Sequence, residues 1–472
     1  MLTMWTRREQ HQAYQFLTRR IISAILSGEP ETNELPMRRF AIALLSGIAV
    51  AVLVVAGFGI YGLLSPGGGR PAENAIILER ETGAKYVYLQ GQLHPVLNWA
   101  SARLIIGQPE PAVRTLSRAS LRDLPRGRPV GIPDAPDALP DKGSLVGLPW
   151  SVCTAPRSAT SIALATHVMV GQVPAGGTPL AANEGVLVTS GASPDRFLVW
   201  RDHRLRVPDN ATVAALGWTG LRPASVAAPF LDTLPAGPDL VPPAIARTGE
   251  RAGRTIAGAD TTIGQLFRAA GQDYVMLAEG LAPVGKLSVR LWVASGQRIT
   301  DVSAQEIGRL LVNSTVEPPG LPNEIPTAHG ADDRFAMACL TYRGATELER
   351  PVTVESFGRV VDGMSLSDSA VPESTGADRV VLPGGRGALV STLTSPGATA
   401  QGSVYLVTDQ GIKYPLPRAN LDTVQASLGY AGVRPVVVPA SILDLVPTGP
   451  ALDPVAATRF TAPASADPAP SR

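Results

Sequence analysis

The sequence predicts a single transmembrane helix followed by a large exported domain of the α+β class that is mostly β. Three observations support this prediction: one long uncharged apolar stretch, many strand-like runs bounded by Gly and Pro, and an internal duplication after the apolar stretch. The duplication indicates four repeat modules around a central β domain, in two halves with pseudo-twofold symmetry. The 472 residues carry a net charge of +1, so they offer no basic field for nucleic acid.

The apolar stretch covers residues 40–64 and contains no charged side chain. As a helix it would be roughly 37 Å long, enough to cross a hydrocarbon core of roughly 30 Å. Arginines precede it, so the positive-inside bias predicts that residues 1–39 stay in the cytoplasm and that the chain after residue 64 is periplasmic. A cleaved signal peptide would have a shorter apolar region and an A-x-A-like site. A buried soluble helix rarely runs so long without a charge.

A short helix is predicted before the membrane, over residues 10–27. Its apolar side chains recur at helical spacing and form one stripe, made of Tyr14, Leu17, Ile21 and Ile25. Gly28 and Pro30 end the helix. Such a small helix needs a cover for its apolar face, either the membrane lipid or another subunit. We expect docking onto another subunit.

Small residues inside the membrane stretch form a second candidate contact. Ala43, Gly47 and Ala51 follow a small-xxx-small spacing, which lets another helix approach closely. The same stretch also spells G-x-G-x-x-G, with Gly57, Gly59 and Gly62. A dinucleotide loop must follow a strand and open a soluble helix, so we expect no dinucleotide site here.

The exported region contains pairs of matching segments. They are residues 86–96 with 274–284, 197–208 with 404–415, and 216–240 with 428–452. The offset is 188 in the first pair and 212 in the last pair, where 13 of 25 positions are identical. Each unit reads as an apolar strand, a short turn, an apolar-x-Pro step, a helix-like stretch and a Pro-rich loop. Four repeat modules follow from this pattern.

The chain is therefore divided as follows. Residues 1–39 form the cytoplasmic helix, 40–64 the transmembrane helix, 65–74 a linker, 75–144 module 1, 145–195 the first part of the central domain, 196–245 module 2, 246–330 module 3, 331–400 the second part of the central domain, 401–455 module 4 and 456–472 a disordered tail.

The central domain is predicted to be a β layer built from both halves. Its strand-like runs lie at 145–153, 163–170 and 185–189, and at 334–342, 351–357 and 387–392. The chain's two cysteines, Cys153 and Cys339, occupy comparable places in these halves and lie on the exported side, where disulfides persist. We expect them to form a disulfide that joins the halves, worth at most about 5 kcal/mol in the loop-entropy model. Two buried free thiols are the alternative.

Motifs for chemistry are few, and we expect no catalytic residue, cofactor or metal. The histidines are scattered, without the spacing of a metal pair: His11, His94, His167, His203 and His329. Asp332 and Asp333 are adjacent and are expected to be solvated. Gly280, Gly285 and Lys286 give G-x-x-x-x-G-K, but Leu287 stands where Ser or Thr must hold magnesium. This segment is expected to be a repeat turn rather than a phosphate loop.

Two segments carry a family resemblance. Residues 8–10 with 13–20, followed by a short linker and one anchor, resemble the start of EccB, the single-pass core subunit of the type VII (ESX) secretion systems of actinobacteria. Residues 97–105 are similar to a family run after the first repeat. The resemblance implies an elongated exported domain with four modules, similar to a cell-wall-binding fold of phage lysins, around a central β domain. It also implies the cysteine pair.

The resemblance implies partners as well: the other core membrane subunits, including the FtsK-like ATPase EccC, EccD and EccE, and self-association of exported domains. Three functions remain open. The first is a structural subunit of the secretion complex, and the second is a nucleotide hydrolase, since ATPase activity has been attributed to some family members. The third is cell-wall binding by the modules. Only 39 residues lie on the cytoplasmic side, too few for a nucleotide-binding domain, which favours the structural function.

Overall fold

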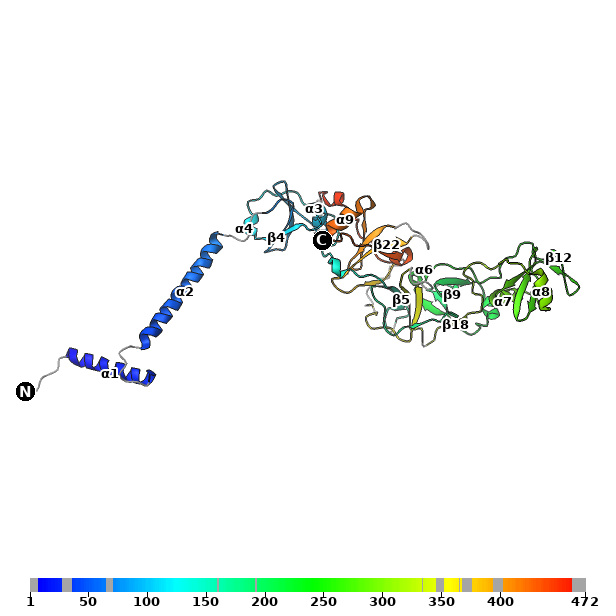
Figure 1. Cartoon of the computed structure of the whole chain (residues 1–472), viewed down its shortest axis with the longest axis horizontal. Coiled ribbons are helices and arrows are strands. Elements are labelled where there is room, and N and C mark those ends of the chain that lie inside the picture. Colours follow the sequence, from blue (N-terminus) through cyan, green and yellow to red (C-terminus); the bar gives the residue numbers. More distant parts are fainter. Residues whose placement is uncertain are drawn as a thin grey trace, which may run out of the picture.

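The computed structural model describes residues 7–27, 36–64, 71–158, 161–191, 193–332, 334–344, 352–364, 366, 376–393 and 402–460. Two helices, α1 (Arg7–Ser27) and α2 (Pro36–Leu64), precede an elongated domain (Figure 1). Among the described residues its strands fall into three four-stranded sheets, one five-stranded sheet, one six-stranded sheet and one two-stranded hairpin. Residues 65–70 of the predicted linker and 461–472 of the predicted tail lie outside the described residues.

The three four-stranded sheets and the five-stranded sheet are named sheets 1 to 4 in chain order. Sheet 1 contains β1 (Ala75–Glu79), β2 (Lys85–Leu89), β3 (Gln92–Pro95) and β4 (Ala112–Leu116), and sheet 2 contains β8 (Glu184–Ser190), β9 (Arg196–Trp200), β10 (His203–Val207) and β11 (Ala224–Val226). Sheet 3 contains β14 (Leu266–Ala269), β15 (Gln272–Met276), β16 (Leu281–Val284) and β17 (Ile299–Asp301), and sheet 4 contains β22 (Ala388–Leu393), β23 (Val404–Val407), β24 (Lys413–Leu416) and β25 (Val436–Pro439). A short strand, β18 (Thr327–His329), adds to sheet 2 beside β8.

All four sheets have the same topology. The first three strands form an antiparallel meander, and the fourth returns parallel to the first, so the order is third, second, first, fourth. One helix connects the third strand to the fourth in each sheet: α3 (Trp99–Ile106), α5 (Asn210–Ala215), α7 (Lys286–Ala294) and α9 (Leu421–Leu428). A second short helix follows the fourth strand: α4 (Arg118–Leu121), α6 (Ala228–Asp232), α8 (Ala304–Leu310) and α10 (Ala440–Leu443).

Local sequence explains the meander turns and helix ends. In the turn between β2 and β3, Gln90 and Gly91 both have positive φ, 51° and 76°, as a type I′ hairpin turn requires. The carboxylate of Glu73 accepts hydrogen bonds from both of their amides, at 3.1 and 2.7 Å. Asn98 caps α3 by accepting from the amide of Ser101 at 3.0 Å. Glu73 lies in the predicted linker, so the end of that segment belongs to sheet 1.

The six-stranded central sheet takes strands from both halves of the chain. Its order is β21-β6-β5-β19-β20-β7, with β5 (Trp150–Pro156), β6 (Leu164–Val170), β7 (Thr178–Pro179), β19 (Met337–Tyr342), β20 (Val352–Phe357) and β21 (Arg379–Val381). One face packs against sheets 2 and 4, because Val152 and Val168 share a core with Val188 of β8 and Val390 of β22. The predicted central layer from both halves is present in this sheet.

The prediction that the runs at 185–189 and 387–392 belong to the central β layer is wrong. They are strands, but β8 and β22 pair within sheets 2 and 4 and not within the central sheet. Sheets 2 and 4 therefore begin before residues 196 and 401, where modules 2 and 4 are predicted to start. Both runs are continuously apolar, so their pattern indicates burial without indicating which sheet they join.

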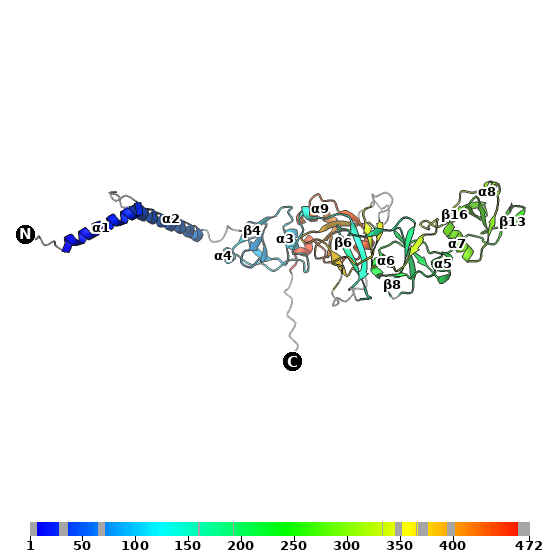
Figure 2. The same ribbon diagram turned by 90° about the horizontal axis from the view of Figure 1, so that it is seen from below.

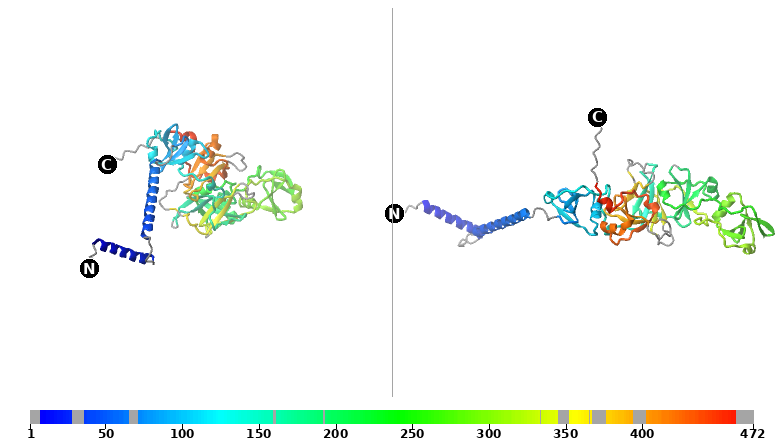
Figure 3. Two further views of the ribbon diagram at one scale, coloured as in Figure 1. Left: turned by 60° about the vertical axis from the view of Figure 1, so that its left-hand side comes forward. Right: turned by 90° about the horizontal axis from the view of Figure 1, so that it is seen from above.

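The helices after the third strands join neighbouring sheets. Helix α3 of sheet 1 packs on α9 of sheet 4, and α7 of sheet 3 packs on α5 of sheet 2. At the first junction the guanidinium of Arg103 donates to the carbonyl of Ser427 at 2.7 Å. At the second, Val213 and Leu291 lie in one core. Sheets 1 and 4 are thus side by side although far apart in sequence, as Figure 3 shows.

The described end of the chain returns to sheet 1. The short helix α11 (Pro454–Ala457) packs on α3, and Phe460 forms a bridge with Val130 and lies under the guanidinium of Arg128, 5.3 Å from the ring centre. Residues 456–460 are therefore ordered, in contrast to the predicted disordered tail. The remaining elements are the 3-10 helices Lys142–Ser144 and Arg418–Asn420 and the hairpin of β12 (Arg251–Ile256) and β13 (Ala259–Thr262). In Figure 2, as in Figure 1, α8 and this hairpin lie at the end farthest from α2.

Candidate functional site

Helix α1 presents its predicted apolar stripe to the surroundings. Tyr14, Leu17, Ile21 and Ile25 are 71%, 59%, 53% and 77% exposed. Ile22, which the sequence analysis did not single out, widens this stripe and is 44% exposed. Burying each such side chain would stabilise a contact by roughly 1.5–3 kcal/mol, so the surface has the composition of a docking face. Its role as a docking face stays a prediction.

Phe16 is a second apolar feature of α1 that the sequence analysis did not use. It is 65% exposed and projects from the side opposite the stripe, with the guanidinium of Arg20 5.9 Å from its ring centre. An isolated aromatic residue outside a periodic stripe gives no docking signal in a sequence, which is why it was missed.

Helix α2 contains the candidate membrane span. Residues Phe40–Tyr61 have a mean hydropathy of 2.6, and none of the most apolar window is buried within the chain. The predicted ridge lies on this surface, and a Cβ added at Gly47 would meet no atom within 4 Å. The ridge of Ala43, Gly47 and Ala51 is thus open to a second helix. The G-x-G-x-x-G glycines lie inside the same continuous helix, in agreement with the prediction that they form no dinucleotide loop.

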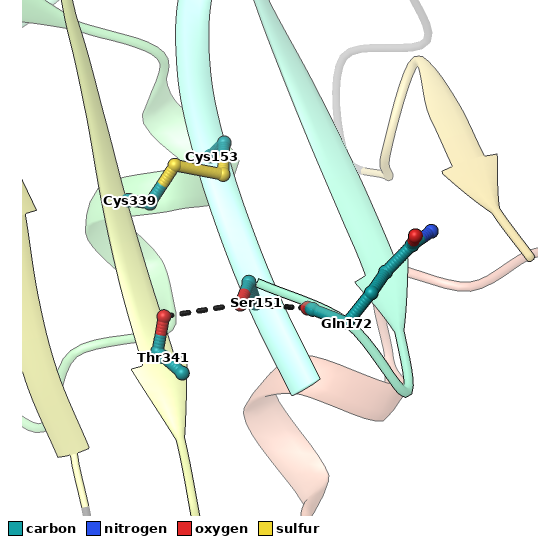
Figure 4. Close-up of a disulfide and its surroundings, with 5 residues drawn as sticks. All are labelled: Ser151, Cys153, Gln172, Cys339 and Thr341. Atoms are coloured by element: carbon teal, nitrogen blue, oxygen red, sulfur yellow. Dashed lines mark hydrogen bonds between the residues drawn. A yellow bond between two sulfur atoms is a disulfide. The ribbon is translucent and has the colours of Figure 1, made fainter. Parts of the chain in front are cut away.

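The two cysteines form a buried disulfide in the central sheet. Cys153 on β5 lies directly opposite Cys339 on β19, and their sulfurs are bonded. Beside them the Ser151 and Thr341 hydroxyls are 3.0 Å apart, and Ser151 also donates to the carbonyl of Gln172 at 3.2 Å (Figure 4). Since β5 and β19 come from different halves, the bond links the halves at the middle of the sheet.

The G-x-x-x-x-G-K segment lies at the start of α7. In a phosphate loop this helix end would bind a phosphate, but here it binds the carboxylate of Glu317. Glu317 accepts a hydrogen bond from the amide of Gly285 at 2.9 Å and another from the hydroxyl of Ser288. Lys286 extends outward to an ion pair with Glu324 at 3.0 Å, and Leu287 is fully buried. A phosphate at this helix end would meet the negative charge of Glu317, so the geometry is that of a structural turn.

The histidines have separate environments. His94 contacts the carbonyl of Arg128, His203 contacts Asp202, and His329 contacts both Glu184 and Arg334. Asp332 accepts from the amide and guanidinium of Arg334, while Asp333 lies outside the described residues. His11 is exposed on α1. Within the part of the chain that the structure describes, no three His, Cys, Asp or Glu side chains could together hold a metal ion.

His167 differs from the other histidines, and the sequence predicts no role for it. It is fully buried on β6, and neither ring nitrogen has a hydrogen-bond partner. Burial lowers its pKa to about 4, against a smaller opposing effect of Asp378. A histidine inside an apolar run gives no signal of this kind, because its partners depend on the neighbouring strands.

A family model described as "Type VII secretion system ESX-1, transport TM domain B" matches residues 3–462. The "ESX-3 secretion system ATPase EccB3" of Mycolicibacterium smegmatis is 30% identical, over 94% of this chain and 89% of that protein. The "ESX-1 secretion system ATPase EccB1" of Mycobacterium tuberculosis is 29% identical, over 99% of this chain and 97% of that protein.

Solved structures show the same fold. A chain of an intact ESX-5 inner membrane complex has a TM-score of 0.67 and 24% identity, and the match covers 100% of this chain and 98% of that chain. An EccB3 dimer from the ESX-3 core complex has a TM-score of 0.66 and 27% identity, with 82% of this chain and 100% of that chain covered. Because the family model spans nearly the whole sequence, the chain belongs to the EccB family of type VII secretion systems.

Proposed function

We propose that this chain is a structural core subunit of an ESX secretion complex, which anchors the assembly in the cell membrane and projects a rigid arm into the periplasm. The observation that carries the proposal is the order of the parts along the chain. One apolar helix without buried contacts of its own leads into one elongated domain, whose sheets share hydrophobic cores at their junctions. Similarity to chains of ESX inner membrane complexes supports the same function.

The proposed topology follows from charge. Residues 1–39 contain arginines and lie on the cytoplasmic side, α2 crosses the membrane, and the chain after it is periplasmic. The match to a periplasmic assembly of an ESX-5 complex, with a TM-score of 0.65, supports this orientation of the exported domain.

The proposed partners are other core membrane subunits, including EccC, EccD and EccE, and a second copy of this chain. The apolar stripe of α1 provides a docking face toward a cytoplasmic partner, and the ridge around Gly47 provides one within the membrane. Lipid covers the remaining apolar surface of α2. The solved EccB3 dimer supports self-association.

We also propose that sheets 1 to 4 are copies of one repeat module, related by a pseudo-twofold axis. Equivalent helices make the junctions in both halves, α3 with α9 and α7 with α5. Sheets 2 and 4 also share a set of contacts made by a cationic side chain on the third strand. In sheet 2, Arg204 lies over the ring of Phe197, donates to the carbonyl of Leu231 and forms an ion pair with Asp232. In sheet 4, Lys413 makes the equivalent contacts with Tyr405, Leu443 and Asp444.

ATP hydrolysis, which the names of the relatives mention, is not part of this proposal. The nearest approach to a phosphate loop has Glu317 at the helix end that a phosphate would need. Cell-wall binding by the modules stays a hypothesis from the resemblance to phage lysins.

Co-purification tests the proposed function. The full-length chain with an affinity tag would be produced in its own host, extracted in a mild detergent and analysed by mass spectrometry. We expect the other ESX membrane subunits in stoichiometric amounts. Recovery of the chain alone, from membranes in which those subunits are present, would contradict a structural core role.

A further inference from the structure

A cavity of about 240 Å³ lies between the central sheet and sheet 2. One wall consists of residues from β5, β6, β19 and β20 of the central sheet, and the facing wall consists of residues from β8, β9, β11 and α6. Protein interiors are close-packed, and voids larger than a water molecule are few in each domain. A cavity of this size at the junction of two sheets is therefore a candidate binding site.

The lining of this cavity is apolar. Val186, Val188 and Val199 face it from sheet 2, and each of them is at most 4% exposed. Within the described residues, no charged side chain lines the cavity. The hydroxyl of Thr154 already accepts a hydrogen bond from the amide of Ala227 at 2.9 Å. Water needs two to four polar partners in such a space, so the lining favours an apolar occupant.

One side of the cavity lies near the surface of the domain. Pro156, Leu164 and Phe335 line that side and are only partly buried, and Ser225 on the edge strand β11 is exposed. A ligand can therefore place an apolar tail between the sheets and keep a polar group in water. Sheets that pack face to face are roughly 10 Å apart, so the space between them suits a linear tail.

The volume of the cavity limits the occupant to one chain. An engineered apolar cavity of about 150 Å³ stays dry and binds a benzene molecule. The cavity between the central sheet and sheet 2 is larger than that by less than a factor of about two, so a single alkyl chain fits and the paired chains of a phospholipid do not.

We propose that this cavity binds the alkyl chain of one single-chain lipid of the fatty-acid class. The bound chain fills the junction between the central sheet and sheet 2 and stabilises it, because it restores the contacts that the lining side chains lack. The proposed site is independent of the contacts through which the chain would assemble with other membrane subunits.

Photochemical labelling tests the proposal on the oxidised full-length chain. The chain would be purified in a detergent with a rigid steroid tail, which offers no alkyl chain as a competitor. The probe is decanoic acid with a diazirine in its chain, and mass spectrometry of peptides identifies the labelled residues. We expect label on residues of β8, β11 and β19 that line the cavity. Unlabelled decanoate in excess should reduce this labelling at least tenfold, whereas phosphatidylglycerol should not.

Label on α2 is the internal reference in this experiment. The apolar surface of α2 lies in the detergent micelle, where the probe also partitions, so excess decanoate should leave this labelling unchanged. The proposal is wrong if the cavity residues of the unchanged chain are not labelled, or if excess decanoate reduces their labelling no more than that of α2. Equal competition by phosphatidylglycerol would contradict a single-chain occupant.

Two variants fill the cavity from opposite walls: Ala224→Phe on β11 and Ala338→Phe on β19. Each should reduce labelling of the cavity at least tenfold, with the near-ultraviolet circular dichroism of the unchanged chain. Val113→Phe is the matched control, because Val113 is 46% exposed on β4 of sheet 1 and should leave the labelling unchanged. Full labelling of a folded Ala224→Phe or Ala338→Phe chain would place the probe outside the cavity and overturn the proposal.

Discussion

Acid should weaken the exported domain through one buried side chain, His167. In the unfolded chain a histidine has a pKa near 6.5, and in the folded chain burial lowers the pKa of His167 to about 4. The unfolded state therefore binds a proton more readily between these values. Stability that is fully present above pH 6.5 is lost as the pH falls toward 4, and the loss levels off below it.

The size of the effect follows from the difference between the two pKa values. At 1.36 kcal/mol per pH unit, the free energy of unfolding should fall by about 3 kcal/mol across this window. Asp378, Arg157 and Arg379 are the charged groups that act on the ring, and the carboxylate alone opposes the loss. Carboxyl groups elsewhere in the chain titrate in the same window. The contribution of His167 is therefore obtained from the difference in the free energy of unfolding between the unchanged chain and a matched variant.

The matched variant is His167→Met, which fills a similar volume and does not titrate. Denaturant unfolding of the oxidised full-length chain would be measured at several pH values between 7 and 4, for both proteins. The free energy of unfolding of the variant, relative to that of the unchanged chain, should increase by about 3 kcal/mol as the pH falls. A difference that stays constant over this range would refute the inference that the ring is buried and unpartnered.

Three further predictions concern topology, the disulfide and α7. A reporter that is active only outside the cytoplasm, fused after Arg472, should be active; activity of a cytoplasmic reporter there instead would reverse the orientation. Thiol labelling of denatured, unreduced protein should modify neither Cys153 nor Cys339, and quantitative labelling would exclude the disulfide. Lys286→Ala should change stability by no more than about 1 kcal/mol, because its ion pair is exposed. Glu317→Ala should lower the free energy of unfolding by about 1–3 kcal/mol, since the Gly285 amide and the Ser288 hydroxyl lose their acceptor. Equal losses in the unfolding curves of Lys286→Ala and Glu317→Ala would argue against a role of Glu317 in stabilising the start of α7.

Several features of the fold could be predicted because they depend on local patterns. Residues 40–64 are long and uncharged, which indicates a membrane span whatever the rest of the chain does. Cys153 and Cys339 could be paired because their places in the two halves are comparable. The valine-rich runs around them indicate strands, and β5 and β19 follow those runs closely.

Other features depend on strand pairing and packing between segments that are distant in the sequence. The local residue pattern does not indicate them. The apolar run at 185–189 reads as a buried strand, but only the structure shows that it opens sheet 2. Phe460 looks like part of a polar, Pro-rich tail, yet it packs on sheet 1. His167 acquires its unpartnered state from the strands on either side, and no spacing in the sequence encodes that.

We propose that the chain assembles into a secretion complex through α1 as well as through its membrane anchor. Leu17→Asp with Ile21→Asp would place two charges in the apolar stripe, where each side chain is worth roughly 1.5–3 kcal/mol when buried. Gln12→Asp with Gln15→Asp adds the same charge elsewhere on the helix and is the control. Co-purification of full-length variants with the other membrane subunits measures the effect directly.

We expect the stripe variant to insert into the membrane and keep its exported domain folded, but to lose the other ESX subunits, while the control retains them. Docking of α1 onto lipid alone predicts a milder outcome, because α2 still holds the chain in the membrane. An intact complex and normal secretion with the Leu17→Asp, Ile21→Asp variant would contradict the assignment of α1 as the assembly contact.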